Sequence, residues 1–205
     1  MAKAGPSSKS PGVAARERLL AAATDLFSRK GYPATTTREI VAAAQVTKPV
    51  LYYYFRNKEG IYVELMGKAF TELDALLDAS QNQRGSATQR LLRLSDQVFN
   101  LFLENIPSAT LMFNIYYGKP QGAPFFDFDA YFLKFVDTIR RLIKIGIRQR
   151  EFLKGSLEDM TWLVLGAVSV ATSAQLFHTK GGVDRKRLAR MVKLILQGFS
   201  AKRKR

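Results

Sequence analysis

The sequence predicts an all-α protein of about nine helices, and three observations support that class. Apolar residues recur every three or four positions along most of the chain, which is the spacing of one face of a helix. No stretch shows the strict apolar–polar alternation of a half-buried strand. Short polar segments rich in Gly, Ser, Pro or Asn separate the periodic stretches, as loops between helices do. The 205 residues suffice for one large core or for two smaller domains.

Charge and composition narrow the classes of function. The chain carries 32 basic and 17 acidic residues, a formal charge of +15, which favours a polyanionic partner such as nucleic acid or an acidic membrane surface. It contains no cysteine, which excludes disulfides and thiolate metal sites, and its single histidine, His178, excludes a histidine-based metal cluster. We therefore expect no metal and no cofactor.

The first thirteen residues are rich in Ser, Pro, Gly and Lys, so we expect a disordered basic arm at 1–13. The arm lacks an apolar segment, so we do not expect a secretory signal. For Lys3 and Lys9 an inert tail is the favoured interpretation, and the alternative is contact with phosphates or the minor groove. For Arg16, just beyond the arm, contact with phosphates or the minor groove is the favoured interpretation.

Two helices are expected next. Residues 14–30 have apolar side chains at helical spacing, and Gly31 can supply the C-terminal stop. Thr36 and Glu39 are spaced as a capping box, which predicts the start of a second, short helix. The apolar residues of this second helix are Ile40, Val41, Ala43 and Ala44.

A third short helix is expected after a break near Gln45. Thr47 is placed to cap it, and Pro49 would lie in its first turn, where a missing N–H costs little. Leu51 and Phe55 are four residues apart and should point inward together. The residues left to face outward are Lys48, Val50, Tyr52 and Tyr53. Two short capped helices with a basic and aromatic outer face are typical of a DNA-reading helix-turn-helix, and the alternative is an αα-hairpin within a helical core.

The same stretch resembles a known family. The residues that carry the resemblance are Gly31-Tyr32, Thr36-Thr37, Ile40, Val46, Leu51-Tyr52, Tyr54-Phe55 and Lys58-Glu59. Over about residues 15–65, without gaps, they are similar to the N-terminal signature of the TetR (tetracycline repressor) family, which implies a three-helix DNA-binding domain. The chain departs from the family pattern at Gln45 and Pro49, where Gly is frequent, and both departures bear on how the recognition helix is aimed.

Position by position, the resemblance implies a set of DNA contacts. The residues expected at phosphates are Thr36, Thr37 and Lys58. Those expected at the backbone or at thymine methyl groups are Tyr52 and Tyr53. Those expected at base edges, where a cation can pair with guanine O6 and N7, are Arg38 and Lys48. The residues that complete the predicted DNA-binding set are Thr47, Pro49 and Val50.

Six further helices are expected, at about residues 57–79, 89–105, 107–117, 125–150, 157–177 and 185–199, the first of them capped by Asn57. A cluster of cations ends the fourth of these and is interpreted as a solvated face rather than a second nucleic-acid site: Arg140, Arg141, Lys144, Arg148 and Arg150. The uncharged run at 160–178 contains several polar residues, so we expect a buried helix, not a membrane span, and a soluble cytoplasmic protein.

Aromatic residues are concentrated in the second half of the chain. Eleven of the 23 lie between Phe99 and Phe135, a density that core packing alone does not require, although core packing remains the alternative. Ligand sites are mostly apolar clefts between helices, and the family resemblance implies a small effector in this region. The effector class expected is apolar or aromatic. The candidate ligand-binding residues are Phe99, Phe102, Phe113, Tyr116, Tyr117, Tyr131 and Trp162.

The last two helices carry small residues and a wide apolar stripe. Such a stripe can serve ordinary core packing, or it can form half of a four-helix interface between two copies. The family resemblance implies the second, because family members are homodimers joined that way. The candidate interface residues are Leu163, Gly166, Ala167, Val170, Leu188, Met191, Val192, Ile195 and Phe199.

The function expected is a sequence-specific DNA-binding transcriptional regulator, a repressor released from a palindromic operator by the effector. The alternative is an architectural protein that binds DNA through charge alone. An enzyme is not expected, because His178 lies outside any nucleophile or carboxylate motif and no phosphate loop is present. The expected domains are the arm at 1–13, a helix-turn-helix domain at 14–60, an effector-binding and dimerisation domain at 61–200, and a solvated basic tail at 201–205.

Overall fold

The computed structural model describes residues 11–118, 122–177 and 182–201. Lys3, Lys9, His178 and the basic tail after Ala201 lie outside the described residues. Within the described ranges the chain forms nine α-helices and no strand, apart from an isolated antiparallel bridge between Phe152 and Ser200. The expected all-α class is confirmed.

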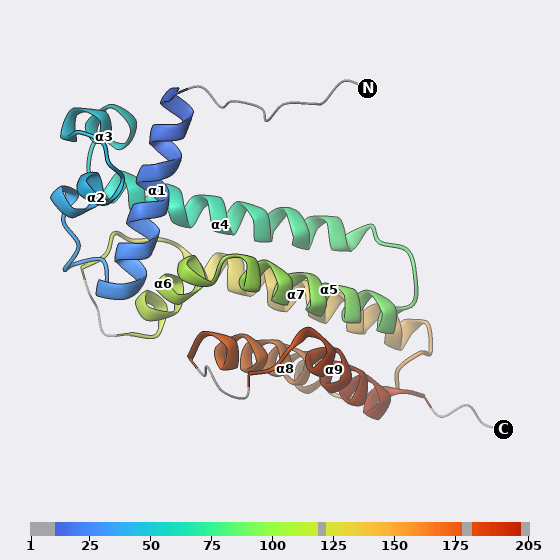
Figure 1. The fold of residues 1–205 in the computed structure, drawn as a ribbon. Coiled ribbons are helices and arrows are strands. Elements are labelled where there is room, and N and C mark those ends of the chain that lie inside the picture. The colour runs from blue at the N-terminus through green and yellow to red at the C-terminus, as the bar shows by residue number, and fades with distance from the viewer. Residues whose placement is uncertain (1–10, 119–121, 178–181, 202–205) are drawn as a thin grey trace, which may run out of the picture. The chain divides into compact units, whose positions relative to one another are not determined.

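The helices follow one another as Figure 1 shows. Their bounds are α1 Pro11–Lys30, α2 Thr37–Ala43, α3 Lys48–Phe55, α4 Lys58–Gln81, α5 Ala87–Glu104, α6 Ile106–Tyr116, α7 Phe128–Arg148, α8 Leu157–Phe177 and α9 Arg185–Phe199. The expected start of α7 at residue 125 was wrong. Asp127 caps α7 through Oδ1, which accepts a hydrogen bond from the Ala130 N–H at 3.0 Å, and this cap sets the start of the helix three residues later.

The described chain divides into two compact units. The first runs to Lys68 and also includes Thr110–Phe126; the second comprises Ala69–Ala109 and the chain from Asp127 onward. Helices α4 and α6 therefore each contribute residues to both units. The expected domain boundary at residues 60 and 61 stays a prediction.

The core of the first unit is built on α1, which packs against α2 and α3. Its stripe of Leu19, Ala23 and Phe27 is fully buried. Ile40 of α2 and Leu51 of α3 are also fully buried, so each short helix is held by its apolar side. Burying a side chain of this size stabilises a fold by about 1.5–3 kcal/mol, which neither short helix could provide from backbone propensity alone.

The second unit packs α5, α7, α8 and α9 against one another. Glu151, after α7, accepts hydrogen bonds from the Ala87 and Thr88 N–H groups at 2.8 and 2.9 Å and so caps the start of α5. Burial alone would raise the pKa of Glu151, but these hydrogen bonds outweigh burial and the pKa is lowered. A Cβ at Gly146 would lie 2.3 Å from the Phe152 ring, so α7 needs glycine at this contact.

Helix α8 is long and apolar enough to cross a membrane by length and composition, so the expectation that this stretch is too polar to do so was wrong. The core helix of a soluble protein meets the same test. Eight residues of α8 are buried, and the helix packs against α5, α7 and α9, so one side of it lies in the core of the second unit. The expected buried helix is therefore confirmed in part, because other residues of α8 stay exposed.

Candidate nucleic-acid interface

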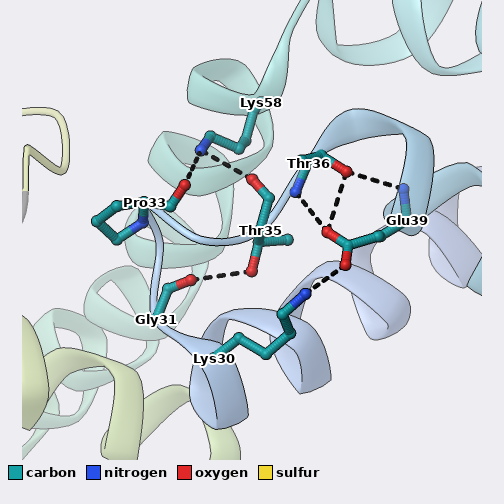
Figure 2. A network of polar contacts seen from close by, with 7 residues as sticks. All are labelled: Lys30, Gly31, Pro33, Thr35, Thr36, Glu39 and Lys58. Carbon is teal, nitrogen blue, oxygen red and sulfur yellow. Dashed lines mark hydrogen bonds and ion pairs between the residues drawn. The ribbon is translucent and has the colours of Figure 1, made fainter.

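The start of α2 is fixed by the predicted capping box. The Glu39 N–H donates to Thr36 Oγ1 at 3.2 Å, and the Thr36 N–H donates to Glu39 Oε2 at 2.9 Å (Figure 2). Lys30, at the end of α1, forms an ion pair with the same carboxylate. Glu39 therefore ties the ends of two helices together. The hydrogen bond from Lys30, followed by those from Thr36, lowers the pKa of Glu39 to about 2.

The turn between α2 and α3 accommodates a side chain where glycine is frequent in the resembling family. Gln45 adopts φ 51°, in the left-handed region, and its side chain is exposed. Just before it, the Ala44 carbonyl accepts a hydrogen bond from Arg18 Nε at 3.0 Å, so α1 holds the C-terminal end of α2. A residue other than glycine in this conformation costs about 1 kcal/mol or more, which the surrounding contacts must offset.

Helix α3 presents the predicted outer face. Thr47 occupies the N-cap position and Pro49 lies in the first turn, as expected, but the Thr47 side chain makes no capping hydrogen bond within α3. Leu51 and Phe55 are buried, 0% and 4% exposed, which confirms the inward pair. The outward residues are Lys48 and Pro49, both exposed, Val50, half-buried, and Tyr52 and Tyr53, 50% and 80% exposed.

Two large exposed tyrosines on an eight-residue helix leave an apolar and hydrogen-bonding surface beside a cation. Tyrosine offers a ring face and a hydroxyl donor, and lysine offers three N–H donors, so this face can contact both base edges and phosphates. On α2, Arg38 is exposed and Thr37 is half-buried. The exposed Thr36 hydroxyl is within hydrogen-bonding distance of Glu39 Oε2 at 3.0 Å and also accepts from the Glu39 N–H, so it serves the cap.

The structure places two expected phosphate contacts inside the first unit. Lys58 Nζ donates to the carbonyl of Tyr32 at 2.8 Å. It also donates to the carbonyl of Thr35 at 2.9 Å (Figure 2). Arg16 forms an ion pair with Glu64 of α4 and lies 5.6 Å from the centroid of the Phe55 ring. Lys58 therefore fastens α4 to the loop between α1 and α2, and Arg16 fastens α1 to α4, roles that their positions in the sequence did not indicate.

The junction of α3 and α4 is tight. Arg56 adopts φ 61°, and the Asn57 N–H donates to the Phe55 carbonyl at 2.6 Å, which closes a γ-turn of the strained kind. Asn57 Oδ1 accepts from the Gly60 N–H at 2.7 Å, confirming the predicted cap of α4. Arg56 is exposed and directly follows α3, so it is a cation of this surface that the sequence reasoning missed. Only its position next to Phe55 could have indicated it.

The predicted ligand-binding residues fall in both units. Within the first unit, the Tyr117 ring packs against Phe113 and Tyr116, with ring centroids 5.3 and 4.8 Å apart. In the second, Phe99 is fully buried and Phe102 is half-buried. The ring centroids of Tyr131 and Phe70 lie 4.6 Å apart. Trp162 is 53% exposed, and its ring centroid lies 6.3 Å from that of Phe132. A shared effector site for this set stays a prediction.

The predicted dimer residues also divide. Leu163 and Val170 are 52% and 59% exposed, and a Cβ at Gly166 would meet nothing within 4 Å, so these three lie on one open face of α8. Met191 and Ile195 are half-buried. Four residues of the set are buried in the core of their own chain, which are Ala167, Leu188, Val192 and Phe199, and the interface as a whole stays a prediction. Exposed apolar residues that the prediction missed on these helices are Trp162, assigned above to the effector, Phe177 and Leu194.

Among the described residues, no group of three or more His, Asp or Glu side chains could hold a metal ion. The outer surface of α2 and α3 offers hydrogen-bond donors, positive charge and aromatic rings. These groups suit recognition of a polyanion.

Comparison with known sequences agrees with this geometry. Residues 19–65 match the family described as "Bacterial regulatory proteins, tetR family". The chain is 35% identical over 101 residues to the uncharacterized HTH-type transcriptional regulator YdgC of Bacillus subtilis, covering 47% of this chain and 52% of that protein. It is 41% identical over 51 residues to the HTH-type transcriptional regulator QacR of Staphylococcus aureus, covering 25% and 27%. The chain spans about half, or less, of the length of these curated relatives.

Solved structures resemble the chain over most of its length. The TetR family regulator PfmR of Thermus thermophilus matches with a TM-score of 0.71 and 24% identity, covering 91% of this chain and 97% of that one. A SmeT–triclosan complex matches with a TM-score of 0.70 and 19% identity, covering 93% of each chain. At these identities the likeness establishes the fold.

Proposed function

Residues 19–65 carry the DNA-binding domain of the tetR family of bacterial regulatory proteins, and from this premise we propose that the chain is a sequence-specific DNA-binding transcriptional regulator. The observation that carries the proposal is the two-sided character of α3. Leu51 and Phe55 anchor it in the core, while Lys48, Tyr52 and Tyr53 stay exposed. A helix held in this way presents a fixed set of side chains to the major groove.

In the proposed complex, the cations read base edges, and the hydroxyls and rings contact the backbone or thymine methyl groups. Arg38 and Lys48 can each pair with guanine O6 and N7. Tyr52 and Tyr53 approach phosphates or thymine methyl groups, and the Thr47 hydroxyl, which makes no capping bond within α3, is available to a phosphate.

The proposed DNA-binding form is a dimer of two copies of the chain. The open face of α8 at Leu163, Gly166 and Val170 supports a two-fold interface in which this face meets its equivalent on the partner, together with Leu194 of α9. Two recognition helices related by this symmetry must lie about 34–36 Å apart to enter successive major grooves. The operator is therefore proposed to be palindromic.

We further propose release by a small apolar or aromatic effector, which makes the protein a repressor. The aromatic residues of α5, α6 and α7 support that ligand class, and a structural relative has been solved as a complex with triclosan. Helix α4 contributes to both units, so a ligand that shifts it would change the separation of the two recognition helices. Such an effector acts through its different affinity for the two separations, typically 1–3 kcal/mol.

The second candidate is an architectural protein that binds any duplex through charge. The formal charge of +15 favours it. Such binding would depend steeply on salt and little on sequence, whereas a regulator keeps its operator against an excess of unrelated duplex. A soluble, cytoplasmic, non-catalytic role belongs to either candidate.

The experiment that tests the proposal is selection of bound fragments from the source genome at physiological salt, with unrelated duplex as competitor. We expect recovery of a small set of fragments that share a two-fold symmetric site. Recovery of fragments in proportion to their abundance would instead establish the architectural role.

A further inference from the structure

We propose that Lys58 is a positioning residue of the DNA-reading surface. Its ammonium group holds the loop at residues 31–36 against the first turn of α4 and does not contact phosphate. The proposal rests on the proposed function, and it concerns how the helix-turn-helix is kept in the shape that DNA requires.

The ammonium group is already engaged by the chain itself. A lysine ammonium has three N–H donors. Lys58 Nζ lies 2.8 Å from the Tyr32 carbonyl oxygen. It also lies 2.9 Å from the carbonyl oxygen of Thr35 and, at the limit of a hydrogen bond, 3.5 Å from that of Pro33 (Figure 2). A phosphate contact would require one of these hydrogen bonds to break.

An aromatic ring fixes the ammonium from another side. Nζ lies 4.2 Å from the centroid of the Tyr32 ring, within the range of a cation–π interaction. Tyr32 is 7% exposed, and its ring packs against Phe27 and against the edge of Tyr62, with centroids 5.3 and 5.2 Å apart. The ammonium of Lys58 therefore lies against a buried ring that is packed on other rings. Its pKa is lowered by desolvation, as expected for an ammonium that has lost part of its water.

The loop is tied to α1 and α2 as well. Thr35 Oγ1 donates to the Gly31 carbonyl at 2.9 Å, and the Thr35 side chain is buried. The Glu39 carboxylate bonds to Thr36 and pairs with Lys30 (Figure 2). The loop carbonyls that Lys58 binds thus belong to a segment of defined conformation.

We call the hydrogen bonds from Lys58 Nζ to the Tyr32 and Thr35 carbonyls the clamp, and its effect follows from its position in the chain. The helix-turn-helix occupies residues 36–57, and Lys58 bonds to the carbonyls of residues 32 and 35. The bonds therefore join the two ends of the segment, and they fix the start of α2 relative to the start of α4. Loss of the clamp would leave the two ends to move separately and would misplace α3, which lies between them.

Salt dependence distinguishes this role from a phosphate contact. A cation that neutralises a phosphate releases counterions and adds about 0.9 to the slope of log K against log salt. A cation bonded to its own backbone adds nothing to the slope. The side chain also matters, because the planar fork of arginine cannot direct three donors at converging carbonyls as an ammonium does.

The test compares Lys58→Met and Lys58→Arg with the wild-type protein and with Lys68→Met, a matched control that removes one exposed charge from the same helix. Affinity for a selected duplex is measured at several salt concentrations. We expect both Lys58 variants to bind about tenfold or more weakly with an unchanged slope, and the control to bind within about twofold of wild type. A slope lowered by about 0.9 per bound subunit in Lys58→Met, with full affinity in Lys58→Arg, would overturn the proposal.

Amide hydrogen exchange of the free protein tests the proposal without DNA. In Lys58→Met, the amides of residues 31–40 should exchange faster, while those of α8 keep wild-type rates. Equal exchange in both regions would overturn the clamp. If Lys58→Met fails to fold, Lys58→Gln, which keeps amide donors, takes its place. Absence of any selective duplex for the wild-type protein would refute the proposed function and leave the exchange result to decide the clamp.

Discussion

The junction of α3 and α4 yields a prediction whose size follows from the structure. A Cβ at Gly60 would lie 2.1 Å from the Phe55 carbonyl oxygen and 3.1 Å from its carbon. Ordinary contacts of a Cβ begin at 3.4 Å, so in Gly60→Ala the end of α3 must retreat by roughly 1 Å. The obstacle is backbone, which cannot move aside as a flexible side chain can.

Two effects set the change in stability. Overpacking of this kind costs about 1–3 kcal/mol, while alanine in place of glycine inside a helix returns up to about 1 kcal/mol. We expect Gly60→Ala to be destabilised by about 0–3 kcal/mol in urea unfolding. DNA affinity should suffer more, because the retreat moves α3 itself. A bidentate base contact contributes about 1–3 kcal/mol, so we expect binding to weaken by roughly five- to 150-fold in fluorescence anisotropy with a selected duplex.

Gly67→Ala is the control within the same helix. Its Cβ would meet nothing within 4 Å, so it should stabilise the protein by about 0.5–1 kcal/mol and leave DNA affinity unchanged. Should Gly60→Ala match this control in both stability and affinity, the reasoning about a tight junction is refuted.

Four further predictions follow from single contacts. Gln45→Gly should stabilise the protein by about 0.5–1 kcal/mol in urea unfolding, because φ 51° favours glycine. Glu151→Gln should lower stability by about 1–2 kcal/mol, because the cap of α5 loses its charge, and an unchanged unfolding midpoint would contradict the cap. The stability that the ionised Glu39 carboxylate contributes should be complete above its ordinary pKa near 4.5 and disappear as pH falls through about 2. Amide exchange at residues 31–40 would report this loss, and in Glu39→Gln this pH dependence should be absent. Val170→Glu should shift sedimentation from dimer to monomer, whereas a dimer that tolerates this charge does not use the α8 face.

Local signals in the sequence predicted much of the first unit. The capping box of Thr36 and Glu39, the stop at Gly31 and the inward pair of Leu51 and Phe55 depend on residues one helical turn apart, and the structure contains all of them. Such features are set by short-range sterics and hydrogen bonds, so the residues themselves suffice to specify them.

Long-range contacts were not predictable in the same way. The destination of the Lys58 ammonium depends on where a loop more than twenty residues earlier lies, and the sequence alone assigned it to phosphate. The interface predicted on α8 and α9 shows the same limit. An apolar stripe indicates burial but does not say whether its own chain or a partner covers it. Leu188 and Val192 are buried in their own chain, whereas Leu163 and Val170 are exposed. Which side of a helix meets which neighbour is decided by tertiary packing.

The central claim is that the outer face of α3 reads base sequence, and the Lys48→Ala specificity profile tests it most directly. Affinities are measured for a selected duplex and for all its single-base variants. We expect a loss of about 1–3 kcal/mol for the preferred duplex and a relaxed preference at one base pair of each half-site. A loss that is uniform across every duplex would assign Lys48 to the backbone and contradict the claim.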